Sequence, residues 1–209
     1  RGLGDVYKRQ TKFNIPVVTT LMGRGAFPDG HELCLEMPGM HGNYTATTSI
    51  QKSDLLIAIG VRFDDRVTAN PSFFAQNAKV IHADIDPAEI GKVREAQVPI
   101  VGDAKSVILG LINALGDTKL NTENWINELN SMKTEFPLSY NQNENGPLKV
   151  PFVLEELQNL TEEEAIVVSG VGQHQMWISQ HWNFTKPNTW LNSCLLYTSD
   201  AADEGWCVG

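Results

Sequence analysis

The sequence has few cysteines and no long apolar run. Only three of its 209 residues are cysteine, and two of these, Cys194 and Cys207, lie close to the C-terminus. Cys34 therefore has no partner for a disulfide within residues 11–193, which weakly favours a reducing compartment. No run approaches the roughly 20 apolar residues that cross a bilayer, so we expect no membrane partner.

Basic side chains are also fewer than acidic ones. The chain has 25 Asp and Glu against 16 Lys and Arg, a formal net charge of −9 at pH 7. That balance disfavours a nucleic-acid surface. The sequence further lacks a Gly-x-Gly-x-x-Gly fingerprint between a strand and a helix, which argues against an ordinary hydride-transferring dinucleotide site.

The two ends read as sequence added during DNA-library preparation. Residues 1–10 can be back-translated into a transposon-end adapter, and Cys194–Glu204 fits the reverse complement of such an adapter. The alternative is ordinary native termini. We predict that residues 1–10 and 194–209 are adapter artefacts, which are excluded from fold reasoning, and that residues 11–193 are an internal fragment of a longer protein.

Short apolar runs separated by polar or helix-like stretches recur along residues 11–117. Four of them predict strands: Ile15–Leu21, Asp54–Val61, Lys79–Ile85 and Val98–Val101. Continuous apolar strands are typical of a parallel sheet covered on both faces. Helices are predicted over residues 45–52 and 104–115, the second capped by Asp103 and ended by Gly116. This alternation predicts an α/β domain with a doubly wound parallel sheet.

The composition changes after this domain. Residues 118–150 are rich in Asn, Thr and Glu and are predicted to be an interdomain linker containing a short amphipathic helix over 125–132. Residues 151–193 then predict the start of a second α/β domain. They combine apolar positions at helical spacing over 152–160 with a buried strand over 165–169.

Polar clusters follow the predicted strands, where open parallel sheets bind ligands. After the second strand, Arg62, Asp64, Asp65 and Arg66 lie within five residues. An ion-pair network would explain this cluster, but a planar guanidinium also binds the two oxygens of a phosphate or carboxylate. The density of charge at a strand end favours a ligand site.

Acidic residues end the next two strands. Asp84 and Asp86 close the third predicted strand, and Gly102–Asp103 follow the fourth. In nucleotide-binding sheets an acid at this position hydrogen-bonds ribose hydroxyls, whereas elsewhere it caps a helix. Two such acids at successive strand ends favour an adenosine-containing ligand.

Three further segments contain candidate residues that are ambiguous by themselves. Arg24 fits a phosphate contact but more simply a turn, and His41 fits either an anion site or a structural hydrogen bond. Gln173 and His174 open a helix after a glycine turn, where a diphosphate is as good an explanation as a plain turn. A metal site from His174 and His181 is disfavoured, because no acidic or cysteine partner is nearby.

Taken in order, six segments resemble the catalytic subunits of acetolactate synthase (acetohydroxyacid synthase), a thiamine-diphosphate-dependent family. They are Thr20–Gly25, Pro38–Gly42, Gly60–Thr68, Val80–Gly91, Val98–Asp103 and Gly172–Trp177. Each segment is weak alone, but six in register are specific. The resemblance implies that residues 11–117 are most of a central FAD-binding domain and that residues 151–193 open a thiamine-diphosphate-binding domain.

The resemblance also implies roles for individual residues. Those matching FAD-contacting segments are Thr20, Leu21, Met22, His41, Gly42, Gly60, Arg62, Asp64, Asp84, Ile85, Gly102 and Asp103. Gln173 and His174 match the thiamine diphosphate segment, and Arg66 matches an arginine that recognises the second 2-oxo acid. The cofactors implied are FAD, thiamine diphosphate and Mg²⁺. The cofactor-activating glutamate and the magnesium ligands are expected outside the fragment, so no catalytic residue or metal ligand is expected within it.

The implied activity is decarboxylation of pyruvate followed by condensation with pyruvate or 2-oxobutanoate, in branched-chain amino-acid biosynthesis. The implied partners are these 2-oxo acids, further copies in a homo-oligomer and a regulatory small subunit. The implied compartment is the cytoplasm, or a plastid or mitochondrion in a eukaryote. Glyoxylate carboligase, pyruvate oxidase and a non-catalytic nucleotide-binding module are the alternatives. Phe63–Arg66 and Gln173–Met176 look more like acetolactate synthase than like the other two enzymes.

Overall fold

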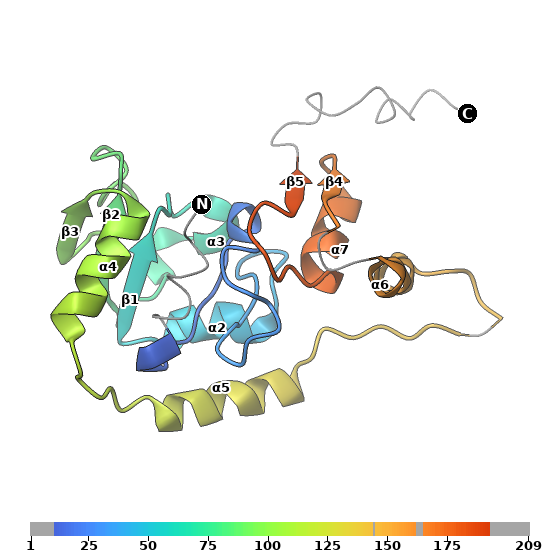
Figure 1. Ribbon diagram of the computed structural model, residues 1–209, viewed down its shortest axis with the longest axis horizontal. Coiled ribbons are helices and arrows are strands. Elements are labelled where there is room, and N and C mark those ends of the chain that lie inside the picture. The colour runs from blue at the N-terminus through green and yellow to red at the C-terminus, as the bar shows by residue number, and fades with distance from the viewer. Residues whose placement is uncertain (1–10, 144, 162–164, 193–209) are drawn as a thin grey trace. The chain divides into compact units, whose positions relative to one another are not determined.

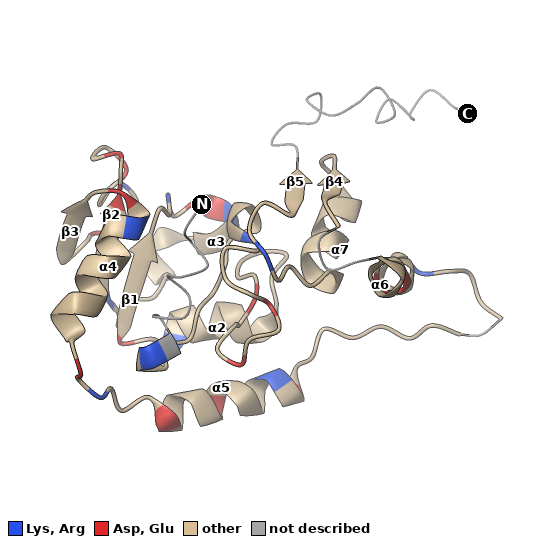
Figure 2. Cartoon of the chain, in the orientation of Figure 1, with Lys and Arg blue, Asp and Glu red and all other residues tan. Residues whose placement is uncertain are grey.

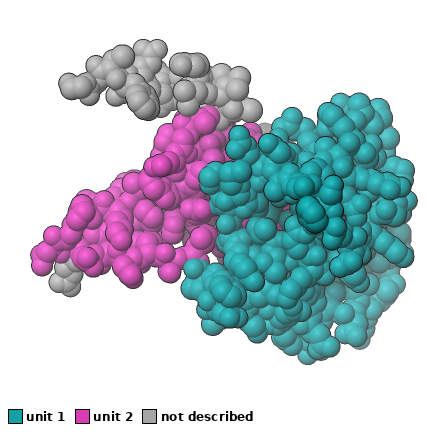
Figure 3. All heavy atoms as spheres, turned by 180° about the vertical axis from the view of Figure 1, so that it is seen from behind, with its two compact units in different colours: residues 1–16, 38–137 teal, residues 17–37, 138–209 magenta. Residues whose placement is uncertain are grey.

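The computed structural model describes residues 11–143, 145–161 and 165–192, and the predicted adapter segments lie outside these residues. The chain divides into two compact units, coloured separately in Figure 3. Unit 1 contains Arg1–Pro16 and Pro38–Pro137, and unit 2 contains Val17–Met37 and Leu138–Gly209. This division differs from the predicted domain boundaries, which remain a prediction.

Unit 1 is built on a three-stranded parallel sheet (Figure 1). Its strands are β1 (Leu55–Ile59), β2 (Lys79–Asp84) and β3 (Val98–Val101), in the order β1-β2-β3. The strands pair in the register Ile59 with Ala83 and Asp84 with Val101. Three of the four predicted strands, and the predicted α/β fold built on a parallel sheet, are therefore confirmed.

Unit 1 contains four described α-helices, of which the first three begin at a side-chain cap. They are α2 (Tyr44–Lys52), α3 (Asp65–Thr68), α4 (Ala104–Leu115) and α5 (Glu123–Glu135), with short 3₁₀ turns η1 (Thr11–Phe13) and η3 (Pro71–Phe73). Asn43 accepts a hydrogen bond from the Ala46 N–H, and Asp103 accepts one from the Ser106 N–H, as predicted for α4. Gly116 ends α4, also as predicted.

The sheet supplies the core of unit 1. Val80 and Ala83 of β2 are buried, as is Ala58 of β1. Helix α4 buries Val107 and Ile108 and packs against β2 (Figure 1). Strand β2 is therefore buried because it has strands on both sides and a helix on one face.

Helix α5 lies in the predicted linker, yet it is part of the packed structure of unit 1. Its Leu129 is 1% exposed and Met132 is 8% exposed. The Lys52 ammonium of α2 lies 2.8 Å from Glu128 Oε1. The Tyr44 and Phe136 rings are 4.2 Å apart, which adds an aromatic contact at the end of the helix. The apolar face of α5 thus packs on α2.

The predicted strand Ile15–Leu21, most of which lies in unit 2, is wrong. Only Val17 makes a strand pairing there, a single parallel bridge to Cys34. The Val17 N–H donates to the Leu33 carbonyl, and the Leu35 N–H donates to the Val17 carbonyl, both at 2.8 Å. The chain then turns into the 3₁₀ segment η2 (Leu21–Gly23). The apolar run therefore pairs with a nearby loop and not with β1.

The rest of unit 2 is the predicted start of a second α/β structure. Its elements are α6 (Val150–Leu160), β4 (Val167–Ser169), α7 (Gln173–His181) and β5 (Trp190–Asn192). Strands β4 and β5 are parallel. Ile178, Trp182 and Phe184 form a buried core, against which Leu154 and Trp190 pack. Among the described residues of either unit, no helix is long and apolar enough to span a bilayer.

The packing of α5 predicts a stability effect that an interdomain linker would not show. Leu129→Ala should lower the free energy of unfolding by about 2 to 5 kcal/mol, because it removes a buried side chain and leaves a cavity. Asn130→Ala on the exposed face of α5 is the matched control and should change stability little. Urea unfolding of both variants measures the difference, and equal midpoints would show that α5 does not contribute to the fold.

Candidate functional site

The carboxyl ends of β1, β2 and β3 meet at one edge of the unit 1 sheet. The backbone ladder continues past two of the strand ends, where the Gly60 N–H donates to the Ala83 carbonyl at 2.8 Å and the Gly102 N–H donates to the Asp84 carbonyl at 2.9 Å. These bonds place Gly60, Asp84 and Gly102 side by side. We name the set gathered here the strand-end site: Gly60, Arg62, Asp64, Asp84, Ile85, Gly102 and Asp103.

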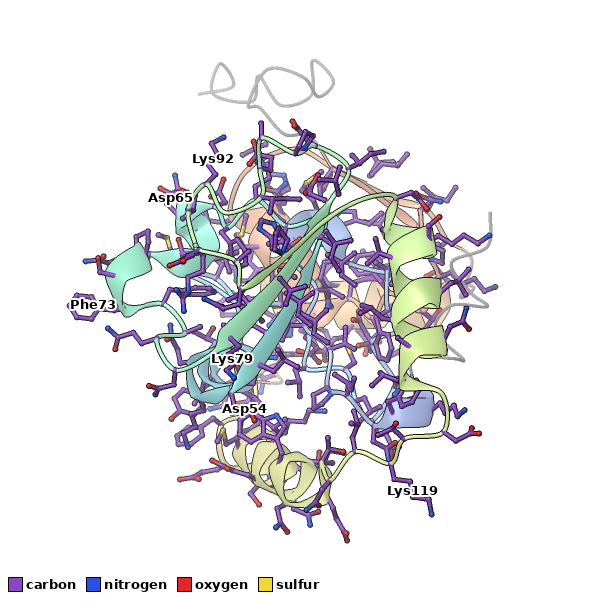
Figure 4. All side chains as sticks on the ribbon, turned by 90° about the vertical axis from the view of Figure 1, so that its left-hand side faces the viewer. Asp54, Asp65, Phe73, Lys79, Lys92 and Lys119 are labelled. Atoms are coloured by element: carbon purple, nitrogen blue, oxygen red, sulfur yellow. The ribbon has the colours of Figure 1, made fainter. Side chains whose placement is uncertain are left out.

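Charged residues mark this edge. Figure 2 shows acidic and basic positions on α3, in the loop after β2 and at the start of α4. Figure 4 shows Asp65 and Lys92 toward this end of the strands, whereas Asp54 and Lys79 lie at the opposite end. The site therefore offers both carboxylates and guanidinium groups to one ligand.

The two strand-end acids cap local structure with one oxygen each. Asp84 Oδ1 accepts from the Asp86 N–H at 2.9 Å, and Asp103 Oδ2 accepts from the Ser106 N–H at 3.1 Å. Within the described residues, the second oxygen of each carboxylate has no partner. Capping and ligand binding are thus compatible. Ile85, which is 73% exposed beside Asp84, adds apolar surface at the same edge.

The Arg–Asp cluster after β1 is not a strong ion-pair network. Arg62 Nη2 lies 3.7 Å from Asp64 Oδ2, and Arg66 Nε lies 3.9 Å from Asp65 Oδ1. The two arginine side chains are 70% and 71% exposed. Ion pairs this long and exposed contribute little to stability. The guanidinium groups are therefore accessible to a phosphate or carboxylate.

Asp64 has a local structural role. Its Oδ1 accepts from the Arg66 N–H at 3.0 Å and so caps α3. This backbone hydrogen bond is the main reason that the pKa of Asp64 is lowered, with smaller contributions from a hydrogen bond with Asp65 and from the charges of Arg62 and Arg66. The carboxylate orders the turn that carries both arginines.

Arg66 lies directly beside the glycine segment that contains His41 and Gly42. The Met40 N–H donates to the Arg66 carbonyl at 2.8 Å, and Arg66 Nη1 lies 3.9 Å from Met40 Sδ. At Gly39, where φ is +100°, a Cβ atom would stand 2.5 Å from the Arg66 carbonyl oxygen. Only glycine permits this approach. The structure therefore joins Arg66, His41 and Gly42 into one local surface of unit 1.

Sequence analysis missed His82, which is fully buried in β2. Its Nε2 lies 2.8 Å from the Val61 carbonyl, and its Nδ1 accepts from the Gly91 N–H at 3.3 Å. A neutral imidazole with its proton on Nε2 satisfies both bonds. The Phe63 ring packs edge-on against it at 5.0 Å. His82 thus contacts Val61 and Phe63, the two residues on either side of Arg62. A histidine within a buried apolar strand was the available signal.

The remaining candidates lie in unit 2. Thr20 is the N-cap of η2, and Leu21 and Met22 are its first two residues. A 2.8 Å hydrogen bond from the Gly23 N–H to the Thr20 carbonyl closes the turn, and Met22 is 68% exposed. Arg24 does not face solvent as a phosphate contact would. Its side chain is 2% exposed and pairs with Asp29. The turn interpretation of Arg24 is therefore the one that the structure supports.

Gln173 and His174 form the exposed first turn of α7. The N-cap, Gly172, supplies no side-chain hydrogen bond. The first N–H groups of α7 thus lack a side-chain cap, and an anion is a suitable partner for such groups. The structure places these two residues together at a helix N-terminus, as predicted.

The described residues show little potential for metal or thiol chemistry. They contain no group of three or more His, Cys, Asp or Glu arranged to hold a metal ion. Burial, with a smaller contribution from the nearby Asp29 carboxylate, raises the pKa of Cys34 to about 12, so this thiol stays protonated at neutral pH.

The contacts of His82 predict a cost for removing its ring nitrogens. His82→Leu should lower the free energy of unfolding by about 1 to 3 kcal/mol, because the Val61 carbonyl and the Gly91 N–H lose their partners. His82→Gln retains a donor and an acceptor and should lose less. Thermal unfolding compares the two, and a leucine variant as stable as the unaltered chain would contradict this role.

The lowered pKa of Asp64 predicts a pH-dependent stability effect. A carboxylate with a lowered folded-state pKa stabilises the fold above its unfolded value, here 3.8, and this contribution is lost as the pH falls through the folded-state pKa. Asp64→Ala should therefore destabilise the chain at pH 7 by roughly 0.5 to 1 kcal/mol. Urea unfolding from pH 7 down to pH 3 should show this difference shrinking. A difference that grows as the pH falls would contradict the assignment.

Comparison with known proteins identifies relatives across most of the chain. Acetolactate synthase of Mycobacterium leprae is 55% identical over 183 residues, covering 86% of this chain and 29% of the relative. The acetolactate synthase large subunit of Corynebacterium glutamicum is 52% identical over 182 residues, with the same shares. Chloroplastic acetolactate synthase 1 of Zea mays is 47% identical over 184 residues, 86% of this chain and 28% of the relative. The chain thus spans less than a third of the length of these relatives.

A domain family matches the first half of the chain. The family described as thiamine pyrophosphate enzyme, central domain, matches residues 5–111, which include the whole sheet of unit 1 and most of α4. The central domain of these enzymes is a doubly wound α/β fold, in agreement with the parallel sheet and helices described above. The chain belongs to the thiamine pyrophosphate enzyme family and carries its central domain.

Proposed function

We propose that the chain is part of an acetolactate synthase catalytic subunit, which joins a decarboxylated pyruvate to a second 2-oxo acid in branched-chain amino-acid biosynthesis. The observation that carries the proposal is the identity of about half of the aligned residues to acetolactate synthases from bacteria and a plant. The accessible guanidinium groups and carboxylates of unit 1 are the chemical groups that this activity needs for a cofactor and an acidic substrate.

FAD is the ligand proposed for the strand-end site. Arg62 suits its diphosphate, and the second carboxylate oxygens of Asp84 and Asp103 suit ribose hydroxyls. Gly60 fits this use because no atom lies within 4 Å of the position that a Cβ would occupy, which leaves open space above the strand end. The exposed Ile85 side chain offers apolar contact to a ring. In this proposal FAD organises the site and takes no net redox part.

Thiamine diphosphate is proposed to bind with its diphosphate near Gln173 and His174. The N-terminus of α7 has no side-chain cap, so its N–H groups and positive helix end suit an anion. When bound, thiamine diphosphate supplies the carbanion chemistry that decarboxylation requires. The magnesium ligands and the activating glutamate are proposed to lie in the part of the relatives that this chain does not cover.

Arg66 is proposed to bind the carboxylate of the second 2-oxo acid, pyruvate or 2-oxobutanoate. Its guanidinium is 71% exposed, and its only ion pair among the described residues is the 3.9 Å contact with Asp65. A planar guanidinium can bind both oxygens of a carboxylate. The close approach of Gly39 to the Arg66 carbonyl fixes the Arg66 backbone and so restricts where the Arg66 side chain can reach.

The assembly and compartment follow from the same proposal. A homo-oligomer with a regulatory small subunit is proposed for the whole protein. The compartment is the cytoplasm, or a plastid or mitochondrion in a eukaryote. Glyoxylate carboligase remains the alternative enzyme, and a nucleotide-binding module without turnover remains the alternative for a non-catalytic chain.

Flavin binding tests the proposed ligand of the strand-end site. Titrating the purified chain with FAD should quench flavin fluorescence. Arg62→Met should weaken binding at least about tenfold, since a charge-assisted hydrogen bond contributes about 1.5 to 3 kcal/mol. Lys79→Met is the matched control, because Lys79 lies at the opposite end of the strands (Figure 4) and should leave binding unchanged. Equal losses in both variants would contradict a specific site at Arg62.

Turnover should need the rest of the protein. The purified 209-residue chain, supplied with pyruvate, thiamine diphosphate, Mg²⁺ and FAD, should release no carbon dioxide above the rate without protein. The physical reason is that the proposed activating glutamate and metal ligands are not part of the chain. Catalysed release of carbon dioxide would show that the described residues contain more of the catalytic machinery than proposed.

A further inference from the structure

A buried ion pair lies next to the η2 turn of unit 2. Arg24 Nη1 and Nη2 lie 2.7 Å from Asp29 Oδ1 and Oδ2, respectively, so the contact is bidentate. The two side chains are 2% and 0% exposed. Burying two charges is costly, and an apolar pair of similar volume is often as stable. Stability alone therefore does not explain this pair, whereas the fixed geometry of a two-point contact can.

On the arginine side, the pair connects the residues on either side of the η2 turn. Arg24 Nη1 also donates to Thr19 Oγ1 at 3.2 Å. Thr19 precedes the turn and is itself fixed by a hydrogen bond from its N–H to the Glu36 carbonyl at 2.9 Å. Arg24 follows the turn directly. One guanidinium thus holds both flanks of Thr20–Gly23.

On the aspartate side, the pair fastens the turn to the core of unit 2. Asp29 Oδ2 accepts from the Phe184 N–H at 2.7 Å, and the Asp29 N–H donates to the Phe184 carbonyl at 3.1 Å. Phe184 belongs to the buried core with Ile178 and stacks on Trp190 at 5.0 Å. Phe184 of the core thus fixes the Asp29 carboxylate that pairs with Arg24.

The chain also approaches itself closely at the turn. At Gly25, where φ is +78°, a Cβ atom would stand 2.7 Å from the Lys186 carbonyl oxygen. The Arg24 guanidinium carbon lies 5.8 Å from the centre of the Phe184 ring. Three contacts within unit 2 therefore hold the turn. They are the bidentate Arg24–Asp29 ion pair, the backbone hydrogen bond between Asp29 and Phe184, and the close approach of Gly25 to the Lys186 carbonyl.

We propose that Arg24 and Asp29 are positioning residues that hold the partly exposed Thr20–Gly23 turn in the shape that contacts the flavin. This inference rests on the proposed function and on the family resemblance, which matches Thr20, Leu21 and Met22 to FAD-contacting segments. The pair acts through the backbone of the turn and does not touch the ligand. Holding the turn before binding lowers the entropy lost when FAD binds, and this is the physical source of the expected effect.

The pKa of Asp29 supports the use of a double variant. Burial raises this pKa, while the Arg24 charge and the Phe184 N–H oppose the rise. Removing Arg24 alone would leave an uncompensated carboxylate in the core. Arg24→Met/Asp29→Asn removes both charges and keeps an acceptor for the Phe184 N–H. It therefore removes the bidentate Arg24–Asp29 contact without leaving an unpaired buried charge that would itself destabilise the fold.

Two measurements on the same set of chains test the inference. The set is the unaltered chain, Arg24→Met/Asp29→Asn, Arg24→Lys and the control Lys52→Met, which removes the exposed pair with Glu128. Amide hydrogen exchange without cofactor should rise at least tenfold at Thr20–Gly25 in the double variant while its urea midpoint stays close to that of the unaltered chain. The FAD dissociation constant should rise at least fivefold. Lys52→Met should change neither quantity.

Arg24→Lys keeps the charge and should give intermediate values, and it replaces the double variant in the test if that variant does not fold. A double variant with unaltered exchange and unaltered FAD affinity overturns the inference and leaves the proposed flavin site intact. Failure of the unaltered chain to bind FAD contradicts the proposed function, and the inference with it.

Discussion

The parallel register of β1, β2 and β3 is the constraint on which the strand-end site depends. Hydrogen bonds from Gly60 to Ala83 and from Gly102 to Asp84 extend the ladder past the strand ends. Residues far apart in the sequence, such as Arg62 and Asp103, therefore emerge from one edge of a sheet. A slip of one residue would turn each strand-end side chain to the other face. Register thus determines which chemical groups a ligand at this edge can meet.

Each unit uses buried polar contacts to hold exposed residues in place. In unit 1, His82 makes hydrogen bonds with the backbone of Val61, which follows β1, and of Gly91, which follows β2. In unit 2, the Arg24–Asp29 pair holds the flanks of the η2 turn. In both cases the exposed residues have few strong contacts of their own, as a ligand site requires. The cost of burying polar groups is offset because nearly all of their hydrogen bonds are formed.

Local signals predicted much of this fold. The apolar runs gave three strands, and the caps Asp103 and Gly116 gave the ends of α4, because these features depend on neighbours in the sequence. Contacts between distant segments were not predictable. The Ile15–Leu21 run has a strand-like composition but pairs with a loop, the apolar face of α5 packs on α2, and the Asp29 carboxylate accepts a hydrogen bond from the Phe184 N–H. The candidate residues came from position after strands and from the family resemblance, and their cofactor contacts remain a prediction.

The most direct test of the strand-end site is hydrogen–deuterium exchange of the purified chain with and without FAD, read by mass spectrometry at peptide resolution. The account predicts slower exchange in peptides that contain Gly60–Arg66, Asp84–Asp86 and Gly102–Ser106, with little change in α5. Because these segments meet only at the carboxyl edge of the sheet, joint protection would locate the ligand there. Protection confined to other parts of the chain, or none at a saturating concentration of FAD, would contradict the central claim.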